Sequence, residues 1–302
     1  MSLLELADPK EDQAALEAWL AERRNGIGGS DAPAAIGESP WKSPLALYCD
    51  KIGIAEPVAD NEKMEWGRLL EPVVAAKYAR ETNREIIDHG RFAIQWSKTH
   101  PFMFATLDRV VRCPNRGEGL LECKTTGAHH EEEWESGVPR LPWIQVQHQL
   151  AVTGHAWASV AVLIGGQIFR YMDIERDQAF IDSLIEDEAK FWSRVQQLDP
   201  PQPDGSWASK EALDRMFPQD NGKIVALGGE FIDLDLELLA VKQDLKSLEQ
   251  RKSEMEQRIK AAIGEAAIGV LPNGVKYTHK TQARAGYVVE PTSFRALRRS
   301  AK

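Results

Sequence analysis

Two carboxylates and one lysine lie in short apolar segments near the middle of the chain. Asp108 closes the segment FMFATLD, and Glu122 and Lys124 follow within the segment GLLECKTT. Side chains in a β-strand alternate between the two faces, so Glu122 and Lys124 share a face and Cys123 points to the other. If the two segments are neighbouring strands, we expect Asp108 to lie beside Glu122.

Such a grouping is suited to a divalent metal ion. Two carboxylates and the backbone carbonyl of Cys123 offer the hard oxygen ligands that Mg²⁺ or Mn²⁺ prefers. Phosphodiester hydrolysis places negative charge on the phosphorus centre and the leaving oxygen, and metal ions stabilise both and activate the attacking water. Lys124 would hold a water and neutralise phosphate charge. A Glu–Lys pair is often only a solvated surface pair, but the apolar context here favours a catalytic metal site.

Two helices contribute further polar residues. Glu71 lies in the phrase WGRLLEP of a helix expected over 62–82, where the alternative is a solvated surface carboxylate. Gln145, Gln147 and Gln149 lie in an otherwise apolar helix, and Gln145 and Gln149 share a face because they are four residues apart. Polar residues on an inward helix face indicate a site, although buried amide pairs also occur as plain structure.

A candidate phosphate-binding segment precedes these elements. Arg23 and Arg24 are followed by a glycine-rich loop and by Ser30 and Asp31, either of which would cap the next helix. A basic pair, a glycine loop and a helix N-terminus together suit phosphate binding. Taken alone this feature is weak, since Gly-Ser turns before helices are common.

The hydrophobic patterns predict an α/β (α+β) fold, with a mixed sheet flanked by helices. The expected helices cover 11–22, 43–52, 62–82, 141–154 and 176–197, and the expected strands cover 90–96, 102–112, 119–126, 157–165 and 168–174. Pro72 is expected to kink or restart its helix. Gly165 and Gly166 suit a hairpin turn between the last two strands.

The proline-rich stretch PPQPDGS at 200–206 predicts a boundary between a core, 1–200, and an extension, 201–302. A stripe of apolar residues at alternating steps of four and three, interrupted by Lys252, predicts a helical hairpin or a coiled coil in the extension. Its members are Leu234, Leu238, Val241, Leu245, Leu248, Met255, Ile259 and Ala262. Small β segments are expected at GVKYTHK and GYVVE, and residues 270–302 form a basic tail with seven Lys or Arg against one acid.

Composition narrows the class of protein. The 302 residues carry a net charge of −9, which argues against a protein that coats nucleic acid but not against one that cuts it. No apolar run is long enough to span a membrane, and the acidic N-terminus does not read as a signal peptide. Three cysteines with no zinc-like spacing suit a reducing compartment, so we expect the cytoplasm of a bacterial or phage-infected cell.

The order of these phrases resembles a known family. Arg23 through Ser30-Asp31, Gly67 through Glu71, Thr106-Leu107-Asp108, Leu121 through Lys124 and Gln145-Val146-Gln147 follow one another as in the lambda-type phage exonucleases. These are also called the YqaJ-type viral recombinase family, within the PD-(D/E)XK nuclease superfamily. The resemblance covers about residues 15–175, and five phrases in the right order are far more specific than E-x-K alone.

The resemblance implies a restriction-endonuclease-like fold and specific roles around a pair of Mg²⁺ ions. Asp108, Glu122 and the Cys123 carbonyl would be metal ligands, and Glu71 would support the second ion or its water. Lys124 would contact the attacking water and the scissile phosphate.

Three more residues take implied roles. Gln145 would orient groups at the site, and Arg23 and Ser30 would hold the 5′-phosphate of a DNA end.

The family implies 5′→3′ resection of one strand of duplex DNA. The 3′ single strand would pass to a single-strand annealing protein for recombination, and a ring-shaped homotrimer would enclose the DNA. The extension from about 205 departs from the compact members and puts the trimer in question. Two alternatives stay open: an endonuclease or structure-specific nuclease on the same fold, and a non-catalytic recombination or assembly module.

Overall fold

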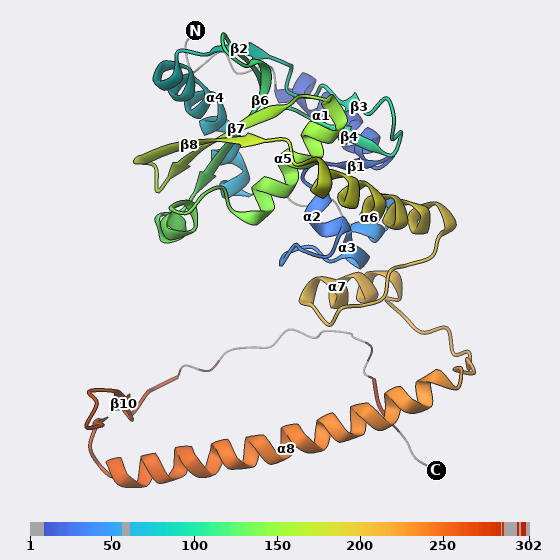
Figure 1. Cartoon of the computed structure of the whole chain (residues 1–302). Coiled ribbons are helices and arrows are strands. Elements are labelled where there is room, and N and C mark those ends of the chain that lie inside the picture. Colours follow the sequence, from blue (N-terminus) through green and yellow to red (C-terminus); the bar gives the residue numbers. More distant parts are fainter. Residues whose placement is uncertain (1–8, 56–60, 285, 287–294, 296, 300–302) are drawn as a thin grey trace. The chain divides into compact units, whose positions relative to one another are not determined.

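Residues 9–55, 61–284, 286, 295 and 297–299 are described by a computed structural model of the chain (Figure 1). The chain forms two units, Met1–Pro218 and Gln219–Lys302. Helix α7 (Trp207–Met216), which falls within the predicted extension, packs in the first unit. There Ala212 joins the core that contains α3 (Pro44–Lys51), and the Ser209 hydroxyl donates to Ser43 Oγ at 2.9 Å. The division into a core and an extension at 200 stays a prediction.

The first unit is built on a five-stranded mixed sheet in the order β2-β5-β6-β7-β8. Strands β6 and β7 are parallel, and every other neighbouring pair is antiparallel. The parallel pair is joined through the 3₁₀ helix η1 (Ala128–Trp134) and α5 (Arg140–Thr153). The strands are β2 (Glu85–Asp88), β5 (Arg109–Cys113), β6 (Gly117–Thr126), β7 (Trp157–Ile164) and β8 (Ile168–Glu175).

Helices cover both faces of this sheet, because its strands β6 and β7 carry buried apolar residues on both sides. On one face, α4 (Glu62–Thr82) packs Val74 and Tyr78 against Leu121 and its neighbours. On the other face, α5 and α6 (Gln178–Gln197) pack against Leu120 and Val160. Alternation along β6 therefore sends Leu120, and the even-numbered residues that follow it, toward α5.

A smaller sheet in the order β1-β4-β3 lies in the same unit. Its strands are β1 (Ile27–Gly28), β3 (Gln95–Trp96) and β4 (Met103–Ala105), with β1 parallel and β3 antiparallel to β4. Helices α1 (Pro9–Arg23) and α2 (Ala32–Ala35) flank β1 in the chain. This sheet anchors the glycine-rich loop that the sequence singles out.

Two strand predictions are corrected. The segment 102–112 is not one strand, because β4 and β5 belong to different sheets and the chain crosses between them at Thr106–Asp108. The segment 90–96 is a strand only at Gln95–Trp96. Strand β5 has β6 on one side and β2 on the other, and the sequence analysis did not predict β2.

Two local predictions involve proline and glycine. Helix α4 runs unbroken from Glu62 to Thr82, so Pro72 does not restart it. Gly165 and Gly166 both have positive φ, 58° and 73°, and the backbone nitrogen of Gln167 donates to the Ile164 carbonyl at 3.1 Å, which closes the turn between β7 and β8. The predicted hairpin is confirmed.

The second unit contains one long helix and a small hairpin. Helix α8 spans Glu230–Ile263 and confirms the predicted helix. Strand β9 (Ile268–Val270) pairs with β10 (Lys276–Thr278), and β10 lies in the GVKYTHK segment, where a small β segment was expected. Most of the GYVVE segment lies outside the described residues.

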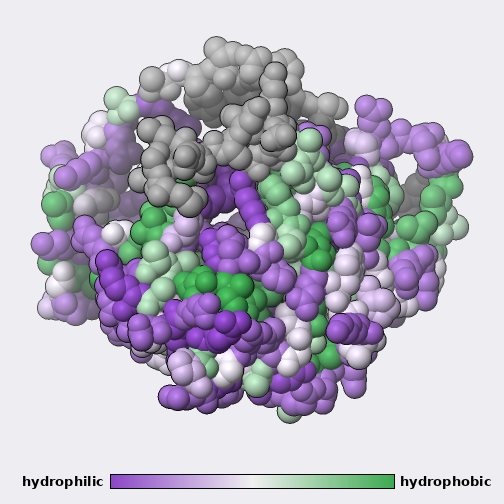
Figure 2. Space-filling model, turned by 90° about the horizontal axis from the view of Figure 1, so that it is seen from above, coloured by the Kyte–Doolittle hydropathy of each residue, from purple (hydrophilic) through white to green (hydrophobic). Residues whose placement is uncertain are grey.

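The face of the molecule in Figure 2 mixes hydrophilic and hydrophobic residues. Among the described residues, no helix combines the length and apolarity needed to cross a membrane.

Candidate active site

The register between β5 and β6 brings Asp108 to Glu122. Arg109 pairs with Leu121, so Asp108, the residue just before β5, lies opposite Glu122 at the end of this ladder. Asp108 Oδ2 accepts a hydrogen bond of 2.8 Å from the backbone nitrogen of Cys123. The side chain of Asp108 thus ties the crossing between the sheets to β6, and the expected proximity of the two segments is confirmed.

Glu122 is 3% exposed, and both of its oxygens accept hydrogen bonds. Oε1 accepts from Lys124 Nζ and from Gln145 Nε2, each at 2.6 Å, and Oε2 accepts from Gln149 Nε2 at 2.8 Å. Lys124 Nζ also donates to Gln145 Oε1 at 2.9 Å. A buried carboxylate is costly unless its oxygens are paired, and α5 supplies the two amides that meet this need.

The charges of this cluster raise the pKa values of Asp108 and Lys124. Burial raises the pKa of Asp108 well above its usual value, and the nearby charges of Glu122 and Glu71 raise it further. Burial by itself would lower the pKa of Lys124, but Glu122 and Asp108 outweigh burial, so that pKa is raised and the ammonium stays charged. Negative charge therefore accumulates where Asp108 and Glu122 meet, and a bound cation would relieve it.

Glu71 approaches from α4 on the opposite face of the sheet. Its Oε1 accepts from Arg109 Nη1 at 2.7 Å, and the same guanidinium nitrogen donates to the backbone carbonyl of Asp108. Arg109 therefore links the carboxylate of Glu71 to the backbone of Asp108. Glu71 influences Asp108 through its charge and through this arginine rather than through a direct hydrogen bond.

The donor chemistry of the site fits Mg²⁺ or Mn²⁺, because its groups are carboxylates and carbonyls and not thiolates or imidazoles. In the described part of the chain, no three His, Cys, Asp or Glu side chains are grouped so that they alone could hold a metal ion. A hard cation between Asp108 and Glu122 would need backbone oxygen, water or phosphate oxygen as additional ligands. Mg²⁺ commonly binds in this way, through one or two carboxylates.

Arg23 and Ser30 are brought together. Arg23 Nη2 donates to Ser30 Oγ at 2.8 Å, and the guanidinium lies over the ring of Trp19 at 4.4 Å from the ring centroid. Stacking on the indole restricts the arginine and leaves donors available for an anion.

The glycine loop between them packs directly on α5. A Cβ added at Gly29 would lie 3.2 Å from the carbonyl oxygen of Gln145 and 3.2 Å from Cγ of Gln149. The absence of a side chain at Gly29 therefore allows the loop to approach the two amides that hold Glu122. The candidate phosphate-binding loop and the carboxylate cluster are adjacent parts of one site.

The helix after this loop differs from the prediction. Helix α2 is one turn long, and Asp31 makes no side-chain capping bond to it. Asp31 is instead buried and accepts from Lys51 Nζ at 2.7 Å. Burial acts to raise the pKa of Asp31, but Lys51, Lys42 and Arg23 hold it well below its usual value. The predicted helix cap at Asp31 is therefore wrong, while phosphate binding at this loop stays a prediction.

Comparison with known proteins identifies the family of this chain. Residues 18–156, which include Arg23 and Gln149, match the model of the YqaJ-like viral recombinase domain. The chain is 35% identical over 272 residues to Uncharacterized protein YqaJ of Bacillus subtilis (strain 168), covering 87% of this chain and 83% of that protein. The chain belongs to the YqaJ-like viral recombinase family.

One solved structure supports the fold of this family member. An alkaline exonuclease, LHK-Exo, from Laribacter hongkongensis has a TM-score of 0.50 and 22% identity, covering 61% of this chain and 94% of that one. The same enzyme in complex with dAMP has a TM-score of 0.49 and 23% identity, covering 66% and 97%. The predicted mixed sheet flanked by helices, of the nuclease type, is confirmed.

The candidate active site contains two residues, Gln149 and Arg109, to which the sequence analysis assigned no role. Gln149 shares a helix face with Gln145, as expected from its spacing, and it holds Glu122 directly. Arg109 carried no signal beyond its place after Asp108. Gln147 points elsewhere, because it donates to the carbonyl of Glu175 and accepts from the backbone nitrogen of Asp177.

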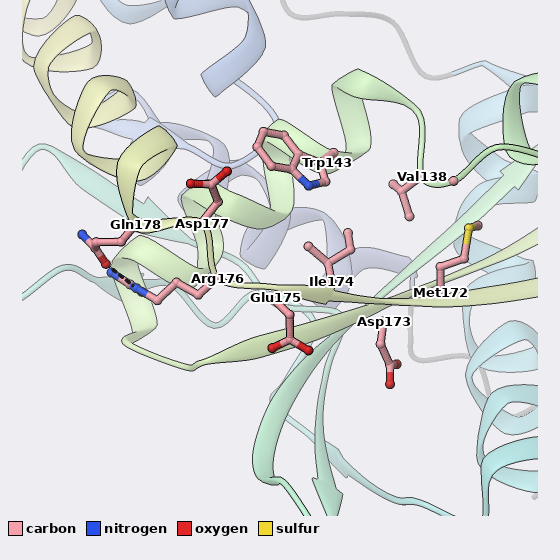
Figure 3. Close-up of a pocket in the computed structure, with 10 residues that line it drawn as sticks. Val138, Trp143, Met172, Asp173, Ile174, Glu175, Arg176, Asp177 and Gln178 are labelled. Atoms are coloured by element: carbon pink, nitrogen blue, oxygen red, sulfur yellow. Dashed lines mark hydrogen bonds between the residues drawn. The ribbon is translucent and has the colours of Figure 1, made fainter.

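A separate hollow lies along β8, the edge strand of the main sheet, and has a volume of about 660 Å³. Figure 3 shows Ile174 on the same side of β8 as Trp143, while Asp173 and Glu175 point to the other side. None of the predicted site residues lines this hollow. We therefore place the candidate chemistry at Asp108 and Glu122 and not in this hollow.

Proposed function

We propose that this chain is a metal-dependent DNA nuclease with its active site at Asp108, Glu122 and Lys124. The observation that carries the proposal is the buried contact among them: Asp108 is held to the Cys123 backbone beside Glu122, and Glu122 is paired to Lys124. Membership of a viral recombinase family and a fold shared with an alkaline exonuclease support it.

Asp108, Glu122 and the Cys123 carbonyl would hold Mg²⁺, or Mn²⁺ in its place, and Glu71 would support a second ion. When bound, such ions activate water and stabilise charge on the phosphate. Asp108 and Glu122 provide the negative charge that attracts the cations. Glu71 adds to it from the α4 face, where Arg109 fixes its position.

Lys124 and Gln145 position the reactants. The Lys124 ammonium has three donors, and it donates to Glu122 and to Gln145. The remaining donor would hold the attacking water or a phosphate oxygen. Gln145 donates to Glu122 and accepts from Lys124, so it holds the ammonium beside the carboxylate.

The substrate we propose is the 5′ end of duplex DNA, resected in the 5′→3′ direction. Arg23 and Ser30 would bind the terminal 5′-phosphate, and the contact of Gly29 with Gln145 and Gln149 supports this role. A phosphate held at this loop would place the first phosphodiester toward the carboxylates. The product would be a 3′ single-stranded tail for a single-strand annealing protein, and the cutting form would be a homotrimer.

Digestion of two DNA substrates tests this function. With Mg²⁺, linear duplex carrying a 5′-phosphate should be degraded, whereas closed circular duplex should stay intact. Cutting of closed circles would favour an endonuclease on the same fold, and no cutting of any DNA would leave only a non-catalytic module. Release of labelled nucleotide from the 5′ end before the 3′ end would establish the polarity.

Variants locate the chemistry. Glu122→Gln and Lys124→Ala should lose cleavage while their far-ultraviolet circular dichroism matches the parent. Lys190→Ala is the matched control, because Lys190 is an exposed lysine that pairs only locally with Asp187 on α6. Parent-like cleavage in Glu122→Gln or Lys124→Ala would remove the proposed site.

Arg23→Ala should slow digestion of 5′-phosphorylated ends more than that of 5′-hydroxyl ends. An equal loss on both ends would remove the phosphate-binding role from Arg23.

A further inference from the structure

Helix α8 presents an apolar stripe that the described residues of its own unit leave exposed, apart from Leu297, Arg298 and Arg299, which line a small hollow with Leu238. All residues of α8 are described, and none of them is buried. The steps of four and three along the stripe are those of a heptad repeat, in which first and fourth positions meet a partner helix. Its first six members are between 40% and 55% exposed: Phe231, Leu234, Leu238, Val241, Leu245 and Leu248.

The stripe continues to the end of the helix. After Lys252, the same spacing leads to Met255, Ile259 and Ala262. A single helix cannot bury such a stripe, and an amphipathic helix in a protein gains its stability by packing that face. The 34 residues of α8 are long enough for almost five heptads.

Charged residues flank the stripe in an ordered way. On one flank the first half carries Glu237 and Asp244, and the second half carries Arg251 and Arg258. Flanking charges of this kind set partner choice and orientation in coiled coils. A flank that is acidic at one end and basic at the other complements itself only when two copies run in opposite directions.

The antiparallel register can be specified. With Leu245 opposite Leu248 of a second copy, Asp244 faces Arg251 of that copy. In the same register, Glu237 faces Arg258 of the second copy, so both pairs on this flank are attractive.

The opposite flank also fits. Lys242 there faces Glu249 of the second copy, which is attractive, and Asp235 faces Glu256 of that copy, which is repulsive. Asp235 is already neutralised within its own chain, because Arg299 Nε and Nη2 donate to its oxygens at 2.8 and 2.9 Å. The single unfavourable pair is therefore relieved.

A parallel pair fits less well. Its flanking pairs balance, since Glu237–Lys242 and Arg251–Glu256 attract while Glu230–Asp235 and Asp244–Glu249 repel, and it sets Lys252 against its own equivalent inside the seam. The antiparallel register instead places Lys252 across from Val241, where the long side chain can reach solvent past a smaller residue.

We propose that α8 is an interaction surface for a second copy of this chain and that the two helices pair antiparallel, with Leu245 opposite Leu248. This inference does not depend on nuclease activity. The pairing joins two protein chains through their C-terminal units and is independent of any trimer formed by the nuclease units.

Spin labels on the full-length chain test the orientation. Ser247→Cys and Lys260→Cys place labels on the outer surface of α8, near its middle and near its end. In the antiparallel pair, the two labels at 247 lie within roughly 20 Å of each other, about two helix widths, and those at 260 lie roughly 40 Å apart along the axis. A parallel pair gives the same short distance at both sites and overturns the proposal.

The parent chain retains Cys49, Cys113 and Cys123, which can also react with the spin label. The parent chain is therefore treated with the label and measured in the same way, as the background. Absence of any distance between chains at both labelled sites also overturns the proposal.

Mass measurement by light scattering tests the stripe itself. Leu248→Lys should reduce the mass of the associated species by half at matched concentration. Leu236→Lys is the matched control, since Leu236 is 58% exposed on α8 but lies outside the stripe. An unchanged mass in Leu248→Lys, or an equal reduction in Leu236→Lys, overturns the proposal. Retained circular dichroism at 222 nm in both variants confirms that α8 is still helical.

Discussion

Gln149 Nε2 donates a hydrogen bond of 2.8 Å to Glu122 Oε2, from a position on α5 that is 2% exposed. Gln145, one helical turn earlier, donates to the other oxygen of the same carboxylate. The two amides and Lys124 together hold Glu122 in one orientation. A group that orients a metal ligand commonly matters for function almost as much as the ligand itself.

Gln149→Leu should lower the cleavage rate by about 10- to 100-fold, the usual cost of losing a group that orients a ligand. The variant leaves Glu122 Oε2 buried without its donor. Gln147→Leu is the control on the same helix: it should reduce the free energy of unfolding by about 1–3 kcal/mol but leave the rate of the folded enzyme near the parent value. Initial rates and urea melts on both proteins make the comparison, and equal rates in Gln149→Leu and the parent would contradict it.

Arg109→Ala should slow cleavage by about tenfold, as for other residues that position a ligand. The arginine holds Glu71 and the Asp108 carbonyl at once, so its loss frees both and leaves Glu71 unpaired near Asp108. Arg112→Ala is the matched control on β5, because Arg112 pairs with Glu85 and Glu118 at the surface. Rates measured across Mg²⁺ concentrations should show the loss in Arg109→Ala alone. A parallel loss in Arg112→Ala would point to general damage of the strand.

Gly29→Ala should reduce activity more than stability. The new Cβ would lie 3.2 Å from Gln145 O and from Gln149 Cγ, so the amides that hold Glu122 must shift by a few tenths of an ångström. We expect a stability cost of about 1 kcal/mol, at the low end for overpacking, together with a clear fall in cleavage rate. Gly229→Ala is the control, since its Cβ meets no atom within 4 Å. A normal rate in Gly29→Ala would separate the glycine loop from the site.

The sequence was sufficient for the parts of the site that depend on local periodicity. Alternation along β6 correctly set Glu122 and Lys124 on one face, and helical spacing correctly set Gln145 and Gln149 together. These relationships lie within a single element, so they follow from its repeat. The bounds of α4, Glu62 and Thr82, were also predicted, although the expected restart at Pro72 does not occur.

The parts that failed depend on contacts between elements. The run from Phe102 to Arg112 is rich in β-forming residues at both of its ends, and nothing in its pattern shows that it changes sheets before Asp108. The link from Arg109 to Glu71 exists only because α4 packs across β5. Likewise Asp31 looked like a helix cap, but it is paired with Lys51 from α3, twenty residues away in the chain.

The pH dependence of stability should reflect Asp173. Burial acts to raise the pKa of this carboxylate, but hydrogen bonds from Arg84 and Ser159 overcome burial and hold the pKa below its usual value. Arg84 donates to both Asp173 oxygens, at 2.8 and 2.7 Å. Because the folded pKa is the lower one, the stabilisation is complete above pH of about 4, the unfolded value, and is lost as pH falls through the folded value.

Asp173→Asn should therefore unfold more easily at pH 7, by about 2 kcal/mol for the loss of charged hydrogen bonds. Its free energy of unfolding should also fall less steeply than that of the parent as the pH drops below about 4. Asp187→Asn is the control, because Asp187 forms only an exposed pair with Lys190. Urea melts between pH 7 and the acid limit of folding measure both effects. If the parent and Asp173→Asn lose stability in parallel on acidification, the pairing with Arg84 does not stabilise the fold.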